Sequence, residues 1–207
     1  MNIANPAAET KSRRRWWLFW LLALILAMAA WLVAFQGNFS VDAIRRVIRL
    51  TAQMSLILFC TAFSASAMAW QWPGPTTFFL RRYRRQIGVS FAFSHGLHAL
   101  ALVAFAKIAP SQFHETADTA MFVFGGLAYV FIAAMTITSF DQTAAWLGTR
   151  RWKLLHTVGS YDIWLVFLIA EGKRAVHNTY YWPYVALLLT VMVLRWVTTI
   201  MRARQST

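Results

Sequence analysis

The chain is poor in acidic residues and in cysteine, and each shortage excludes a class of protein. Only 7 of its 207 residues are Asp or Glu, and Cys60 is the only cysteine. A scaffold held together by disulfides is therefore excluded. Charged residues make up 13% of the chain, against about 25% in soluble domains, while hydrophobic residues make up 59%. This composition excludes a disordered chain and predicts an integral membrane protein.

Several motifs are also missing. No internal repeat or low-complexity tract occurs, and no glycine-rich nucleotide fingerprint follows the last apolar run. We therefore expect no flavin or nicotinamide domain in this polypeptide. The single cysteine and the lack of a Glu-x-x-His spacing also argue against a Cys/His metal cage.

The positive charge has a topological explanation. The formal net charge is +13, and the 20 Lys and Arg residues cluster beside the apolar runs. Such clusters are typical of signals that orient helices in a bilayer, so we expect lipid and no nucleic acid as a partner.

Six apolar runs have about the length of 20 residues that a membrane-spanning helix needs. They cover residues 16–35, 50–70, 87–106, 119–140, 154–170 and 182–201. The sequence predicts an all-α bundle of six transmembrane helices in one domain, residues 16–201. A basic segment, residues 1–15, precedes this domain, and a short tail, residues 202–207, follows it. The first run exceeds the 7 to 15 residues of a signal-peptide core, so we expect an uncleaved first helix.

Most of the Lys and Arg residues lie on one side of such a bundle, at 11–15, 81–85, 150–153 and 202–204. Fewer lie on the other side, chiefly at 45–49 and 173–174. This asymmetry predicts that both termini are cytoplasmic, in a bacterial inner membrane. Pro73 and Pro75 predict that the second helix ends there and that residues 71–86 form the longest inner connection.

Histidines inside the spans are the main candidates for chemistry, because polar side chains in lipid are costly unless paired, ligated or hydrated. His95 and His98, three residues apart, are expected to project from one face of the third helix. His156 lies near the inner end of the fifth. Such imidazoles suit axial ligation of haem iron, a proton relay, or hydrogen bonds between helices. His114 and His177 fall in outer loops, where we expect ordinary solvated side chains.

Other in-span residues favour a structural interpretation. Asp162 and Arg195 are the two charged residues within the fifth and sixth runs, and we expect them to pair between helices. Arg195 would alternatively extend to the membrane interface. Small residues at 64–67, together with Gly125 and Gly126, indicate close helix packing.

Two sequence blocks resemble the ferric-reductase-like transmembrane family, with the closest likeness to its MsrQ type. MsrQ-type proteins are the haem-binding membrane subunits of a methionine sulfoxide reductase system. The first block is Arg84-Arg85-Gln86-Ile87-Gly88, with Phe91-Ala92-Phe93 and Leu97-His98. The second is Thr138-Ser139, Leu147-Gly148, Arg151-Trp152 and Leu154-Leu155-His156. The likeness covers about the middle two thirds of the chain.

The resemblance implies a b-type haem between the third and fifth spans that passes electrons across the membrane. His98 and His156 stand at the family's histidine positions and would be the axial ligands. A further family histidine is replaced here by Ile169, so we expect one haem, and His95 is a possible replacement ligand for His156.

The partners implied are a separate electron donor, either a cytoplasmic flavoprotein or a membrane quinone, and an extracytoplasmic acceptor. The chain would then be the electron-transfer subunit of an oxidoreductase system. The alternative, motivated by Ile169, is a haem-free scaffold or small-solute transporter of the same fold.

Overall fold

The chain forms a bundle of long helices in the computed structural model, which describes residues 16–116 and 119–205. No strand occurs in these two ranges. The elements are α2 (Trp17–Gln36), α3 (Val41–Gln71), α4 (Pro75–Ile108), α5 (Pro110–Thr116), α6 (Thr119–Ile137), α7 (Asp141–Leu147), α8 (Thr149–His177), the short 3-10 helix η1 (Thr179–Tyr181) and α9 (Trp182–Gln205). The predicted all-α membrane bundle is therefore confirmed. The expected basic segment at 1–15 lies outside the described residues.

Five of the helices are long and apolar enough to cross a membrane: α2, α3, α4, α8, and α9 with η1. The fourth expected span, residues 119–140, is not one straight helix. Instead α6 ends at Ile137, and the chain bends by 108° into α7, so a sixth span exists only if this bent pair counts as one. The bend is held by an ion pair between Asp141, at the start of α7, and Arg85 of α4, at 2.8 Å.

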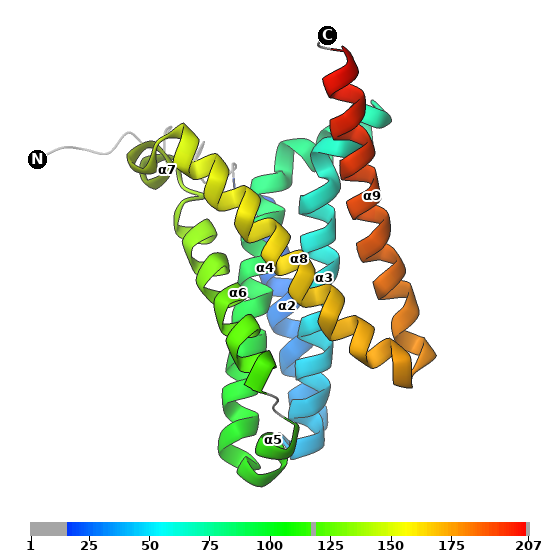
Figure 1. The fold of residues 1–207 in the computed structure, drawn as a ribbon. Helices are drawn as coiled ribbons and strands as arrows, with labels where there is room; N and C mark the ends of the chain where they lie inside the picture. Colours follow the sequence, from blue (N-terminus) through cyan, green and yellow to red (C-terminus); the bar gives the residue numbers. More distant parts are fainter. Residues whose placement is uncertain (1–15, 117–118, 206–207) are drawn as a thin grey trace, which may run out of the picture.

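Successive long helices alternate in direction, so the start of α4, the start of α8 and the end of α9 lie at the same end of the bundle (Figure 1). We call this the arginine-rich end, because it carries the cationic segments 81–85, 150–153 and 202–204. Helix α5 and the start of α9 lie toward the opposite end (Figure 1). The cytoplasmic location of the arginine-rich end stays a prediction.

The predicted loop at residues 71–86 is wrong. Only Trp72, Pro73 and Gly74 separate α3 from α4. Pro75 is the first residue of α4, a position where the missing N–H of proline costs nothing. The Thr77 hydroxyl accepts a hydrogen bond from the Gly74 N–H at 3.1 Å and so caps the helix. Consequently the cationic residues 81–85 lie on a helix and project from defined faces.

The core lies where α3, α4, α6, α8 and α9 meet. Its buried side chains are mainly aromatic and aliphatic: Leu56, Phe59, Cys60, Phe63, Phe91, Ala128, Ile132, Ile163, Phe167, Leu188 and Val191. Helices α3 and α4 share the most extensive contact, along a seam that contains Ser55 and Ser94, whose hydroxyls are 3.0 Å apart. Small hydroxyl side chains allow close approach and hydrogen-bond across the seam.

Gly159 of α8 lies at a close contact between helices. A Cβ added there would lie 2.6 Å from the Met135 sulfur of α6, so α6 and α8 pack closely at this point. A Cβ at Gly125 or Gly126 would meet no atom within 4 Å. The expected role of these two glycines in close packing is therefore wrong.

The expected pair of Asp162 and Arg195 does not form. Arg195 donates a hydrogen bond to the Phe63 carbonyl of α3 at 2.8 Å, and its guanidinium lies 4.0 Å from the centre of the Phe63 ring. Asp162 Oδ2 has no hydrogen-bond partner among the described residues. Arg195 therefore connects α9 to α3 through the carbonyl and the ring of Phe63, and no carboxylate takes part.

Candidate functional site

His98 lies on α4, buried against α3 with 8% of its surface exposed. Its Nδ1 is 3.0 Å from the Ile48 carbonyl and 3.2 Å from the Thr51 hydroxyl. Thr51 gives its own proton to the Val47 carbonyl at 2.7 Å, so Nδ1 faces two acceptors and must carry the ring proton. The lone pair is therefore on Nε2. Metal-ligating histidines almost always have this arrangement, with the other ring N–H held by a carbonyl or carboxylate.

His95 stacks on His98, with ring centres 5.2 Å apart and ring planes 25° apart. Phe91 and Tyr129 surround it at 5.6 and 4.8 Å between ring centres, and Phe167 of α8 lies at 5.8 Å. Its Nδ1 has no hydrogen-bond partner among the described residues. The expectation that the two imidazoles share one face of a helix is confirmed. Because they do, they cannot approach one iron atom from opposite sides.

His156 lies near the start of α8, half-buried, and stacks on Trp152 at 4.2 Å. Its Nε2 is 3.1 Å from the Thr138 hydroxyl. That hydroxyl donates to the Ala134 carbonyl at 2.7 Å, so Nε2 carries the proton and Nδ1 the lone pair. Either nitrogen of an imidazole can bind a metal.

A cavity of about 410 Å³ opens at the arginine-rich end between α3, α4, α6, α7 and α8. This is within the usual range of ligand pockets, about 300–1,000 Å³. Its apolar wall is formed by Phe59, Phe63, Phe91, Ala92, Ile132 and Ile163. Its polar wall includes His156, Thr138, Ser139 and Ser160. An aromatic lining with a few convergent polar groups is typical of a cofactor site.

Four arginines line the same cavity: Arg81, Arg82, Arg84 and Arg85. Arg84 is fixed by hydrogen bonds from Nε to the Ala62 carbonyl at 2.9 Å and from Nη1 to the Ser66 hydroxyl at 3.4 Å. Arg85 pairs with Asp141, the one carboxylate in the lining, while its Nε is buried with no partner among the described residues. The cavity is therefore electropositive and suits a ligand with an apolar body and anionic groups.

His156 and Phe91 both line the cavity, and the His95 ring packs on Phe91 at 5.6 Å between ring centres. His98 does not line it. Phe167, which packs on His95, follows His156 by eleven residues, about 16 Å along α8. The structure thus brings His95 and His98 together and places His156 at a different depth.

Glu171 of α8, which is 1% exposed, was not among the residues singled out from the sequence. It lies one residue beyond the fifth apolar run, 154–170. Glu171 follows the buried Ile163 and Phe167 at four-residue spacing, which is the signal that would have placed it on the buried face. Of the two outer histidines, His114 is exposed on α5 and His177 ends α8.

No group of three His, Cys, Asp or Glu side chains in the described part of the chain could hold a metal ion alone. No family model, curated protein or solved structure matches this chain.

Proposed function

We propose that this chain is a membrane-embedded b-type haem protein of the ferric-reductase-like kind, closest to the MsrQ type, that carries electrons across the bilayer to an extracytoplasmic acceptor. The cavity at the arginine-rich end carries the proposal. It combines a histidine on its wall, aromatic walls and guanidinium groups, which are three features that a haem with its two carboxylates needs.

The residues present provide part of what would hold a haem. His156 is the ligand from the cavity wall, and Arg84 and Arg85 would hold the haem carboxylates. His98 and His95 are the candidates for the other side of the cavity, behind Phe91. His98 is the better candidate ligand of the two, because its Nδ1–H is held by the Ile48 carbonyl and its Nε2 is unprotonated. When bound, the haem supplies one-electron redox chemistry at its iron.

The surrounding residues give the site its selectivity for electron transfer. The apolar walls exclude water, which keeps the iron from reacting with solvent. The arginines face the end from which a cytoplasmic flavoprotein or a membrane quinone would deliver electrons. The acceptor, an extracytoplasmic protein, would dock at the opposite end.

The test is the absorption spectrum of the purified protein, produced with ample haem. We expect a Soret band that shifts on reduction with dithionite, and a pyridine adduct of the b type. His156→Ala should lose most of the haem, and His98→Ala should lose haem or shift the band.

His114→Ala is the matched control, since it removes an exposed histidine outside the bundle core and should keep the full spectrum. Folded protein without iron would reject the proposal and favour the haem-free scaffold or transporter. A spectrum unchanged in both His156→Ala and His98→Ala would reject the ligand assignment.

A further inference from the structure

Glu171 occupies a position on α8 where an apolar residue is expected. The buried stripe of this helix follows a four-residue spacing: Gly159, Ile163, Phe167, Glu171 and Ala175. Four of these five side chains are small or apolar. The fifth is a carboxylate with 1% of its surface exposed. A buried carboxylate inside a membrane bundle is costly and is a functional candidate by default.

The carboxylate is only half satisfied. Its Oε1 accepts a hydrogen bond from Arg174 Nη1 at 2.8 Å. Its Oε2 is buried with no partner among the described residues. A pair with only a structural role would need both oxygens satisfied to offset the desolvation of the charges. The free lone pairs on Oε2 are therefore placed to receive a proton.

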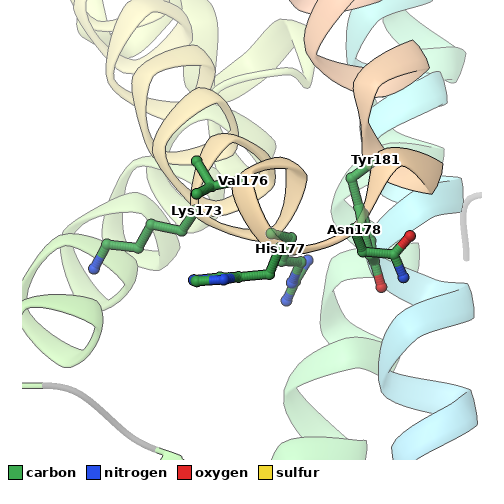
Figure 2. Close-up of a pocket in the computed structure, with 6 residues that line it drawn as sticks. Lys173, Val176, His177, Asn178 and Tyr181 are labelled. Carbon is green, nitrogen blue, oxygen red and sulfur yellow. The ribbon is translucent and has the colours of Figure 1, made fainter.

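Arg174 connects this carboxylate to the outside. Its side chain is 33% exposed and lines an open hollow of about 540 Å³ at the end of α8. Figure 2 shows the hollow with Lys173, His177 and Asn178 around it. The hollow lies at the end of α8 remote from the arginine-rich end (Figure 1). Arg174 thus spans the distance between the buried carboxylate and the open hollow.

On its inner side, Glu171 lies close to the redox candidates. Phe167, one turn earlier on the same face, packs on the His95 ring at 5.8 Å. Ile163, two turns earlier, lines the cavity, and it precedes Glu171 by eight residues, about 12 Å along the helix. The carboxylate thus stands between the cavity and the hollow.

We propose that Glu171 is a proton-binding site coupled to electron transfer, an inference that rests on the proposed haem function. When one electron from the external donor enters the bundle, Glu171 takes one proton from the hollow side at Oε2. When the electron leaves to the acceptor, the proton returns to the same side. The bound proton offsets part of the charge that the electron brings into the low-dielectric interior, in proportion to the change in proton affinity at Glu171.

Other ionisable groups lie on the elements around Glu171. His95 of α4, which packs on Phe167, also has a buried nitrogen, Nδ1, with no partner among the described residues. Arg174 carries a positive charge and has no acceptor atom. Tyr180, Tyr181 and Tyr184 lie on η1 and α9, where the Tyr180 and Tyr184 hydroxyls contact each other at 3.4 Å. On α4, His98 holds its Nδ1 proton on the Ile48 carbonyl, and its Nε2 is the candidate iron ligand.

The experiment is a redox titration of the haem at several pH values, in the full-length protein and in Glu171→Gln. In the unmodified protein the midpoint potential should fall as the pH rises. The limiting slope is tenfold in the equilibrium constant per pH unit, which is 59 mV for a one-electron couple. Glu171→Gln, which keeps the shape and cannot ionise, should show a potential independent of pH. Glu115→Gln, at an exposed acid on α5, is the control and should behave as the unmodified protein.

Two further readouts separate proton binding from a structural role. Infrared difference spectra, reduced minus oxidised, should contain the C=O band of a protonated carboxyl group, absent in Glu171→Gln. Arg174→Gln removes the charge that favours the ionised carboxylate, so the pH range of the slope should move upward. If Glu171→Gln does not fold, the shifted pH range in Arg174→Gln still tests the proposal.

The outcomes separate the two proposals. Haem bound with the same pH slope in Glu171→Gln overturns the proton site and leaves the haem function standing. Folded protein without haem overturns both.

Discussion

Replacing Arg195 with methionine should lower the free energy of unfolding by about 2–4 kcal/mol. The guanidinium donates to the Phe63 carbonyl at 2.8 Å and lies 4.0 Å above the Phe63 ring. A hydrogen bond from a charged group contributes about 1.5–3 kcal/mol. A cation–π contact contributes about 0.5–2 kcal/mol, depending on its exposure to water. The Phe63 carbonyl keeps its regular helix bond, so no buried acceptor is left unsatisfied, which favours the lower half of the range.

The assay is reversible unfolding of the purified protein in mixed micelles with a denaturing detergent, followed by circular dichroism. Arg195→Lys keeps the charge and loses the planar donor group, so its loss should be intermediate. Arg150→Met, at an exposed arginine at the start of α8, is the matched control and should change stability by less than about 0.5 kcal/mol.

The same assay tests whether Arg195 is independent of Asp162. Because the two side chains do not pair, the effects of Arg195→Met and Asp162→Asn should add to within about 0.5 kcal/mol. A coupling energy above about 1 kcal/mol would show that the residues interact, and the contacts assigned to Arg195 would then be wrong.

Four more substitutions test local packing and a helix cap by the same unfolding measurement. Gly159→Ala should cost about 1–3 kcal/mol, because the new methyl group would lie 2.6 Å from the Met135 sulfur. Gly126→Ala meets no neighbour and should be neutral or stabilising by up to about 1 kcal/mol, and equal losses in the two would refute the close approach of α6 and α8. Ser40→Ala should cost about 1 kcal/mol, because the Ser40 hydroxyl accepts the Ala43 N–H at 3.3 Å at the start of α3. Ser40→Asp should restore the stability, and its failure to do so would argue against this cap.

Much of the fold follows from the lengths of the apolar runs and from the composition of the chain. Five of the six apolar runs lie on single helices, because backbone groups in lipid must be satisfied within the segment, while the fourth run bends after Ile137. The connections were harder to predict. Proline at position 75 is compatible with the end of one helix and equally with the first turn of the next. The structure shows the second case, with α4 extending from Pro75 over residues 81–85. The bend after Ile137 likewise depends on tertiary contacts, such as Arg85 with Asp141.

The candidate site was predictable where it depends on one helix. The shared face of His95 and His98 follows from their three-residue spacing, and their stacked rings confirm it. The position of His156 relative to that pair also depends on the course of α8, which runs obliquely to α4 (Figure 1). The sequence does not show the angle between these two helices. The cavity was not predicted, because five helices contribute its lining and their packing angles do not follow from the sequence.

The size of the proton coupling at Glu171 should reveal where in the cavity the haem lies. His156 and Glu171 are fifteen residues apart on the one helix α8, about 22 Å, while Ile163 at the cavity wall is about 12 Å from Glu171. With an effective dielectric constant of about 20, one added charge changes the energy of a proton by about 0.8 kcal/mol at 22 Å and about 1.4 kcal/mol at 12 Å. The corresponding ratios of proton affinity, reduced over oxidised, are about fourfold and tenfold.

A tenfold ratio in the redox titration would therefore place the iron near Ile163, toward His95 and His98. A fourfold ratio would place it beside His156. The ligand variants give an independent answer, because an iron near Ile163 predicts the larger spectral change in His98→Ala and an iron beside His156 predicts it in His156→Ala. A fourfold ratio combined with haem loss only in His98→Ala would contradict the assumed electrostatic coupling along α8.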